Sequence, residues 1–366
     1  MDENRFMKFC LRGLEKTYIP SENVFAASRK LQDGRMMHIR DRNLEYRFTM
    51  NALMGLHRLQ SYGTEVFLNI ESEYHLIAER IDEHANSPLD IAATVWTGRC
   101  LGTEIPKKIQ SLFQSLLKNA PQMKQLGPKA LAWSIAACLT GATDDHRHAN
   151  SLAKLAAEKY IHPESGLVRQ DPSGFRRNWA PFGAQSYMIF AFLFLARLTE
   201  NAWAKDIGLF MARKLVQLQG KEGQWGWMYH VPTGRVVDYY PVFSVHQYAY
   251  APLFLLEAID NGYEEFREPL VKGFRWVLGQ NEMGQSMVDS AHQIVWRRVF
   301  RRAANAKLMK VLRAMLIIYG GLKSEIITAD ALDIDHQCWG FEMALPLFAF
   351  SGRKDFSEIL NDSRFS

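Results

Sequence analysis

PFGAQSYMIFAFLFLARL at residues 181–198 is followed by NAWAKDIGLFMARKLVQLQ at residues 201–219. The first stretch is apolar nearly all round, which is typical of a helix buried on every side. The second has one apolar stripe and one polar, solvent-exposed face, which is typical of a helix at the protein surface. The pair predicts a helical hairpin with one inner and one outer member.

The same alternation runs through most of the chain. Further apolar helices are expected at 43–59, 87–102, 127–142, 240–259 and 336–352, and further amphipathic helices at 64–84, 105–120, 148–161, 263–280 and 305–321. The repeat is roughly 40–60 residues, as in stacked helical hairpins. This pattern predicts one all-α domain over residues 1–366, a double ring of six inner and six outer helices. The segment 281–304 is either an insertion or a seventh, more polar inner element.

The double ring resembles the (α/α)6 toroid over most of the chain. That architecture is shared by six-hairpin glycosidases, polysaccharide lyases, sugar epimerases, lanthionine cyclases and the terpenoid cyclase and prenyltransferase superfamily. The resemblance implies the fold, whereas function has to be argued from a site.

Composition excludes several other classes of protein. Hydrophobic residues make up 48% of the chain and charged residues 23%, which allows a large core and argues against disorder. The net charge of +5 is spread out, apart from the cluster Arg297, Arg298, Arg301 and Arg302. A solvated helix face or an anion-binding patch explains that cluster, and we expect no nucleic-acid partner.

The sequence carries no recognised cofactor or metal motif. The four cysteines form no CxxC pair, so buried thiols in a reducing compartment are expected. There is no phosphate-binding glycine loop, GxSxG or HExxH. The first residues lack the apolar region of a signal peptide, and the longest apolar run, 187–196, is too short to span a bilayer. We therefore expect a cytoplasmic protein without cofactor, metal or transmembrane segment; the oligomeric state stays open.

Chemistry is expected where polar segments precede the inner helices, because these segments would meet at one mouth of the ring. The candidate catalytic residues are Asp238, Tyr240, His246, Asp335 and Glu342. The candidate substrate-binding residues are Arg42, Tyr46, Arg47, Asn178, Trp179, Trp225, Trp227, Gln247 and His336.

The residue types suggest a role for each candidate. His246 and Tyr240 would transfer protons, with Asp238 and Asp335 as carboxylate partners. The tryptophans would stack on sugar rings, and Arg42 and Arg47 would bind anionic groups. Structural roles are the alternatives: loop packing for the tryptophans, helix capping for Asp335, and a salt bridge for the arginines.

Glu342 stands out because it lies inside an otherwise apolar helix, where a carboxylate is almost never left unpaired. It either faces the site with a partner or belongs to a buried ion pair.

Two resemblances point to different chemistry. Gln219, Gly223 and Trp225 fit the Q-x3-G-x-W pattern of terpenoid cyclases, and Asp333-Ile334-Asp335-His336 is similar to their DxDD acid motif, with His336 in place of the last Asp. This resemblance implies Asp335 as a protonating acid. The combination of Tyr, His, Asn and Arg residues is instead similar to that in the active sites of uronate lyases and epimerases. Two carboxylates that face each other would resemble the active site of a glycoside hydrolase.

The sequence thus predicts a carbohydrate-active enzyme that acts on an acidic poly- or oligosaccharide by acid/base chemistry as a lyase, epimerase or hydrolase. A terpenoid cyclase-like enzyme is one alternative. A non-catalytic binding or assembly protein in polysaccharide biosynthesis is the other.

Overall fold

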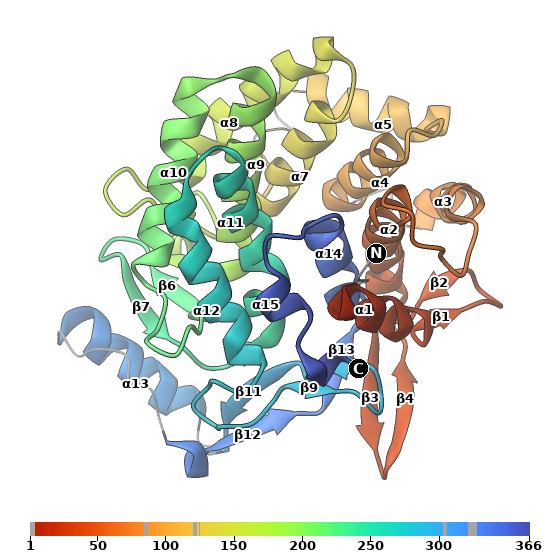
Figure 1. The fold of residues 1–366 in the computed structure, drawn as a ribbon. Helices are drawn as coiled ribbons and strands as arrows, with labels where there is room; N and C mark the ends of the chain where they lie inside the picture. The colour runs from red at the N-terminus through yellow and green to blue at the C-terminus, as the bar shows by residue number, and fades with distance from the viewer. Residues whose placement is uncertain (1–3, 84–86, 120–122, 124, 303–305, 321–327) are drawn as a thin grey trace.

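The computed structural model describes residues 4–83, 87–119, 123, 125–302, 306–320 and 328–366. Within these residues, a closed inner ring runs through the centre of the molecule (Figure 1). It consists of α2 (Arg42–Ser61), α4 (Pro88–Leu101), α7 (Pro128–Leu139), α9 (Phe182–Thr199), α11 (Ala251–Asp260) and α14 (Gly340–Phe350). Each helix contacts the next, and α14 closes the ring against α2.

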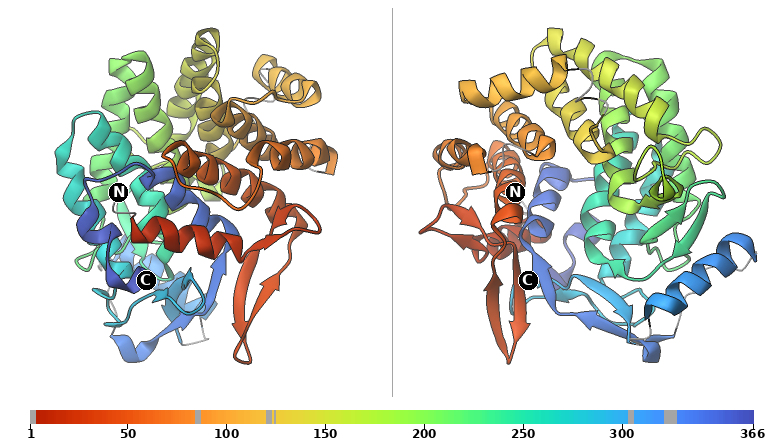
Figure 2. Two further views of the ribbon diagram at one scale, coloured as in Figure 1. Left: turned by 45° about the vertical axis from the view of Figure 1, so that its right-hand side comes forward. Right: turned by 180° about the vertical axis from the view of Figure 1, so that it is seen from behind.

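A second layer of amphipathic helices covers the inner ring (Figure 2). Its members are α3 (Ile70–Ala78), α5 (Lys107–Lys118), α8 (His146–Tyr160), α10 (Ala202–Val216), α12 (Arg267–Val277) and the N-terminal α1 (Arg5–Glu15). The predicted (α/α)6 toroid is therefore confirmed.

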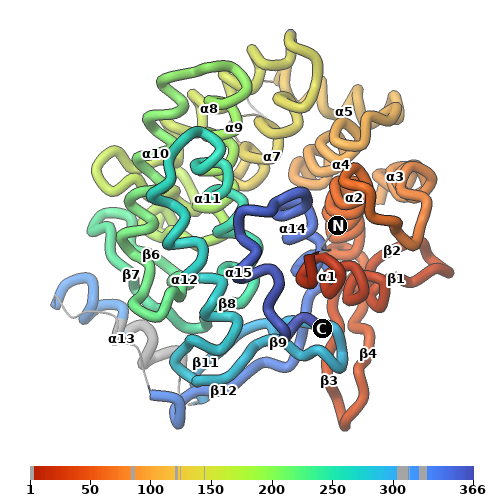
Figure 3. The backbone as a smooth tube through the Cα atoms, viewed as in Figure 1, coloured from red at the N-terminus to blue at the C-terminus, as the bar shows by residue number. Residues whose placement is uncertain are grey.

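The predicted position of one outer helix is wrong. Residues 305–321 were expected to supply the sixth, and they do hold a helix, α13 (Ala306–Tyr319). However, α13 lies beside β7 and projects away from the ring (Figure 3). The helix that pairs with α14 is α1, which buries Phe6, Phe9 and Cys10. The first segment of the chain thus completes the last hairpin.

Small residues and helix caps shape the inner ring. A Cβ atom on Gly55 of α2 would lie 2.4 Å from the carbonyl oxygen of Ala344 on α14, so glycine permits the close approach that closes the ring. The side chain of Asp41 accepts hydrogen bonds from the backbone N–H groups of Asn43 and Leu44 and caps the start of α2.

Short strands, which the sequence pattern did not predict, precede several inner helices. One sheet has the order β13-β3-β4, from β3 (Ser28–Gln32), β4 (Arg35–Ile39) and β13 (Gln337–Trp339). A second has the order β5-β6-β7, from β5 (Trp179–Pro181), β6 (Met228–His230) and β7 (Arg235–Asp238). A third has the order β12-β11-β8, from β8 (Val242–Phe243), β11 (Arg298–Arg301) and β12 (Leu332–Asp335). These sheets hold the segments that enter α14, α9 and α11.

The segment 281–304 is an insertion of strands and not a seventh inner helix. Its described part, up to residue 302, forms β9 (Val288–Asp289), β10 (Ile294–Val295) and β11. A further two-stranded ribbon joins β1 (Tyr18–Ile19) to β2 (Val24–Phe25), and a short α15 (Ser357–Leu360) lies near the C-terminus.

Among the described residues, α9 has the length and apolar composition needed to cross a membrane. However, 78% of its 18-residue window is buried inside the protein, which is what an inner helix of a toroid requires.

Candidate functional site at the start of the inner helices

The first two turns of the inner helices bring polar side chains to one mouth of the ring. These side chains are Arg47 of α2, Asp90 of α4, Lys129 of α7, Tyr187 of α9, and Glu342 of α14. His246 and Tyr250 come from a π-helical turn, His246–Tyr250, that leads into α11. Single π-turns inside helices are frequent at functional sites.

His246 lies in a stack of aromatic rings. Its imidazole is 4.5 Å from the ring centre of Phe182, 5.7 Å from that of Tyr250, and parallel to Trp227 at 6.4 Å. The side chain is 4% exposed, and Nδ1 is buried without a hydrogen-bond partner. Burial, followed by the positive charges of Lys129 and Arg297, lowers the pKa of His246 to about 3. The imidazole is therefore neutral at physiological pH.

Lys129 projects from the first turn of α7 toward this histidine. Its side chain is exposed to solvent, yet surrounding protein and the charge of Arg47 lower the pKa of its ammonium. A Cβ atom on Gly183 would come within 3.3 Å of the Lys129 Nζ, so that glycine leaves space for the ammonium. Arg47 donates from Nε to Asp90 Oδ1 at 2.7 Å, which fixes the guanidinium beside it.

Two tyrosines complete this part of the mouth. The hydroxyls of Tyr187 and Tyr250 are hydrogen-bonded, and their rings meet edge to face at 5.2 Å. Burial raises the pKa of both phenols, so both remain protonated at neutral pH. Each hydroxyl can donate a proton to a ligand or accept a hydrogen bond from it.

Arg297 and Glu342 also lie near His246 and Tyr250, since the charge of Arg297 acts on His246 and that of Glu342 on Tyr250. The Arg297 guanidinium stacks over Trp339 at 3.8 Å from the ring centre, and its Nε is buried without a hydrogen-bond partner. Glu342 accepts a hydrogen bond from the backbone N–H of Trp339 at 3.0 Å, which caps the start of α14. Burial raises the pKa of Glu342 to about 8, against the opposing effect of Arg297. Glu342 thus has a structural partner as well as a place at the mouth.

An aromatic pocket of about 370 Å³ lies beside the mouth, between the β5-β6-β7 sheet and α13. Its lining includes five candidates from the sequence: Asn178, Trp179, Trp227, Asp238 and Tyr240. Because Trp227 also stacks parallel to His246, it connects the pocket to the mouth.

The two proposed acid/base residues in this pocket are already engaged. Asp238 accepts a hydrogen bond from Arg301 at 2.9 Å, and the Tyr240 hydroxyl donates to Glu282 at 2.9 Å. These contacts assign them to the pocket wall.

Two other candidates lie in the core. Trp225 is 0% exposed and packs between Phe182 and Phe254, so neither face of its ring is free for a sugar. Gln247 is also fully buried, and its amide donates to the Phe243 carbonyl. Both residues are core residues in this structure, and substrate contact for them stays a prediction.

The remaining candidates from the sequence hold local structure. The buried Tyr46 shares a hydrogen bond of 2.7 Å between its hydroxyl and that of Thr94. Asp335 on β12 accepts from Arg298 on β11 at 2.8 Å, which is a cross-strand ion pair. His336 and Arg42 are exposed, and His336 packs edge to face against Trp296.

The Q-x3-G-x-W pattern has a structural explanation. The Gln219 side-chain amide donates to the carbonyls of Gly223 at 2.8 Å and Pro269 at 3.0 Å, and so fixes the turn that leads to Trp225. The pattern therefore ties α10 to α12 through this turn.

Sequence reasoning missed Lys129, Tyr187, Tyr250, Arg297 and Trp339. Lys129 carried a usable signal, because it is the only charge in GPKALAWSIAACLTGA (127–142), a situation like that of Glu342. Arg297 was named only within the cluster of Arg297, Arg298, Arg301 and Arg302, for which a solvated helix face and an anion-binding patch were the two explanations. The two tyrosines lie in apolar helices, where tyrosine is equally common in the core.

No protein-family model matches the chain, and no curated protein matches it in sequence. Solved structures do match its fold. A cellobiose 2-epimerase from Bacillus thermoamylovorans has a TM-score of 0.67 at 9% identity, with 95% of this chain and 97% of that one covered. An α-1,6-mannanase from Salegentibacter has a TM-score of 0.57 at 11% identity, with 96% of this chain and 98% of that one covered. An unsaturated glucuronyl hydrolase from Streptococcus agalactiae has a TM-score of 0.57 at 10% identity, with 94% of this chain and 90% of that one covered.

At these identities the likeness shows the fold alone. The chain has the (α/α)6 toroid architecture that these carbohydrate-processing proteins share.

Proposed function

We propose that the protein is a carbohydrate-active enzyme that transfers a proton on an acidic saccharide, as an epimerase or a lyase. The observation that carries this proposal is the convergence of Lys129, Arg47 and Arg297 with His246 and the Tyr187–Tyr250 pair at one mouth. The fold is one on which carbohydrate chemistry has been built repeatedly, as the similar solved structures illustrate.

The cations favour an anionic substrate. Within the described residues, Lys129 has no carboxylate at ion-pair distance, and Arg297 stacks on Trp339 with its Nε unpartnered. A uronate carboxylate would supply the missing negative charge and accept hydrogen bonds from both groups. Trp227 and Trp339, both half-buried, would then lie against the apolar faces of the sugar rings.

The neutral imidazole supplies the base. Removal of the proton on the carbon next to a carboxylate leaves negative charge on the carboxylate oxygens, which Lys129 and Arg297 would stabilise. The proton would pass to His246. Burial is the main cause of its low pKa, and the anionic group of the substrate would offset the second cause, the neighbouring positive charges. The Tyr250 hydroxyl would protonate the leaving oxygen for elimination, or return a proton to the carbon for epimerisation.

Hydrolysis is less well supported. Inversion or retention needs two carboxyl groups that face each other across the glycosidic bond. Among the described residues of the mouth and its pocket, Asp90 and Asp238 are each bound to an arginine, and so is Asp335 on β12 outside the pocket. Glu342 is held by the Trp339 backbone, so no opposed pair is free.

A cyclase role finds no support in the geometry either. Asp335 is held in its ion pair with Arg298, and the Gln219 pattern forms a turn. Neither residue lines the aromatic pocket.

A turnover screen tests the proposal. Purified protein is incubated with uronate-containing oligosaccharides, and NMR follows the appearance of an epimerised or unsaturated sugar. His246→Gln should abolish the product. A matched control exists because Ser290-Ala291-His292-Gln293 has the same Ser-x-His-Gln pattern as Ser244-Val245-His246-Gln247. His292 bonds to Asp289 at 2.8 Å outside the mouth, so His292→Gln should leave turnover intact. Equal loss in both variants, or turnover of prenyl substrates instead, would overturn the proposal.

A further inference from the structure

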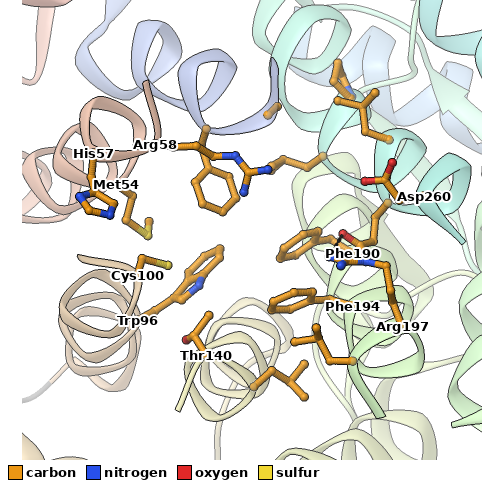
Figure 4. A pocket seen from close by; sticks show the side chains of 18 of the residues that line it. Met54, His57, Arg58, Trp96, Cys100, Thr140, Phe190, Phe194, Arg197 and Asp260 are labelled. Carbon is orange, nitrogen blue, oxygen red and sulfur yellow. Dashed lines mark hydrogen bonds and ion pairs between the residues drawn. The ribbon is translucent and has the colours of Figure 1, made fainter. Parts of the chain in front are cut away.

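A second pocket lies at the other end of the inner ring. Its volume is about 460 Å³, within the range of small-molecule sites. The C-terminal halves of α2, α4, α7, α9, α11 and α14 supply its lining (Figure 4). Arg47 at the mouth and Arg58 in this pocket both lie on α2, eleven residues apart, which corresponds to about 16 Å along a helix. The two sites are therefore separate.

Most charges in this pocket are already compensated. Arg197 donates to both carboxylate oxygens of Glu257, at 2.5 and 3.2 Å, and Arg353 pairs with Asp260 at 2.5 Å. Arg99 is held by Asp145 at 2.6 Å. His57, whose pKa is lowered by burial, adds no positive charge at neutral pH.

Arg58 is the exception. Within the described residues, no carboxylate lies within ion-pair distance of it, and its Nε is buried without a hydrogen-bond partner. Its guanidinium lies 5.3 Å from the ring centre of Phe348. Trp96, which lines the same pocket and is 98% buried, has its indole Nε1 without a partner as well. Two buried donors without acceptors are unfavourable unless a ligand supplies the acceptor.

The walls between these donors are aromatic. Trp96 lies 5.9 Å from Phe190 and 5.7 Å from Phe348, and Phe190 is stacked on Phe194 at 5.4 Å. In Figure 4 the side chains of Arg58, Trp96, Phe190 and Phe194 lie around one space. A flat apolar body would bury its faces against the rings.

The geometry points to a second ligand site, for a small molecule that carries a carboxylate or phosphate on an apolar ring. Its anionic group binds Arg58 and the Trp96 N–H, and its ring lies against Phe190, Phe194 and Phe348. This site is distinct from the mouth where we place catalysis, and it does not depend on the proposed reaction.

Isothermal titration calorimetry with phenyl phosphate and with benzoate tests the site. At least one of the two should bind once per chain. Inorganic phosphate, which lacks the ring, and phenol, which lacks the charge, should each bind at least about tenfold more weakly. Arg58→Gln should weaken binding of the preferred probe by about tenfold or more, because a charge-assisted hydrogen bond is lost. Arg213 pairs with Glu265 on the exposed outer layer, so Arg213→Gln is the matched control and should bind normally.

Trp96→Phe provides a second variant if Arg58→Gln fails to fold. It keeps an aromatic wall but removes the N–H donor, so binding should weaken several-fold. The site is refuted if neither probe binds the wild-type protein, if phenol binds as well as phenyl phosphate, or if the folded variants bind like the wild type.

Discussion

The imidazole of His246 and the phenol ring of Tyr250 lie 5.7 Å apart and 29° from parallel. The two residues are the first and last of one π-helical turn, and Pro252, which has no backbone N–H, lies two residues after Tyr250. The turn thus presents a neutral base and a protonated hydroxyl side by side at the mouth of the toroid. The proton transfer that we propose depends on this pair of residues.

The hydroxyl of Tyr250 should be required for turnover. Tyr250→Phe keeps the ring that stacks on His246 and removes only the proton donor, so we expect turnover to fall by about 10²–10⁴-fold. Steady-state kinetics on an active uronate oligosaccharide measure this change. Tyr248 offers a control two residues earlier, because its buried hydroxyl has no hydrogen-bond partner in the described structure. Tyr248→Phe should leave turnover and stability unchanged; equal loss in both variants would argue against a role for the Tyr250 hydroxyl.

Lys129 should select the charge of the substrate. Lys129→Met removes the ammonium beside His246 and keeps a flexible apolar chain of similar length. We expect affinity for an acidic oligosaccharide to fall by about tenfold or more, since charge-assisted hydrogen bonds are the strong ones. Affinity for a neutral oligosaccharide of the same length should not fall, and calorimetry on both ligands measures the difference. Parallel losses for the two ligands would mean that Lys129 supports the fold of the mouth.

Glu342 should make stability depend on pH. Its folded pKa of about 8 lies above the ordinary value of 4.5, so between these values the folded state holds a proton that the unfolded state releases. The contribution of Glu342 to the free energy of unfolding is therefore fully present below pH 4.5 and is lost as the pH rises toward 8. The loss is at most about 1.4 kcal/mol per pH unit. Glu342→Gln keeps an acceptor for the Trp339 N–H and cannot titrate.

Denaturant unfolding of both proteins across this pH range measures the difference. The free energy of unfolding of the wild type should fall relative to that of Glu342→Gln as the pH rises. If the variant is instead destabilised by roughly 3–5 kcal/mol at every pH, Glu342 acts as an ionised member of a buried pair.

Trp225 and Trp227 should behave in opposite ways. Trp225 is fully buried, so Trp225→Ala should cost about 3–5 kcal/mol of folding free energy. Trp227 lines the aromatic pocket and is half-buried, so Trp227→Ala should weaken oligosaccharide binding with a smaller loss of stability. Thermal unfolding and calorimetry on the two variants separate these effects. Similar stability losses would show that Trp227 is a core residue too.

Hydrophobic periodicity predicted the inner ring well, because a helix that is buried on all sides is apolar at nearly every position. It missed the strands, since pairs such as Ser28 with Trp339 join segments far apart in the chain and only two to five residues long. It also misassigned the last outer helix, because ring closure uses α1 from the other end of the sequence.

The site was only partly predictable. The segment ahead of α11 did lead to His246, and the isolated charge in an apolar helix led to Glu342. The same rule applied to the helix at 127–142 would have found Lys129. By contrast, Trp225 and Trp227 are two residues apart in one loop, and only the fold shows that one is core while the other faces the pocket.

Hydrogen exchange at the reacting carbon tests the central claim most directly. An acidic oligosaccharide is incubated with the protein in D₂O, and NMR follows deuterium at the carbon next to the carboxylate. We predict enzyme-dependent incorporation of deuterium at this carbon for an epimerase, or loss of its proton to an unsaturated product for a lyase; His246→Gln should abolish either change and His292→Gln should leave it intact. Conversion to a saturated epimer without any incorporation, or either change surviving in His246→Gln, would contradict proton transfer at this mouth.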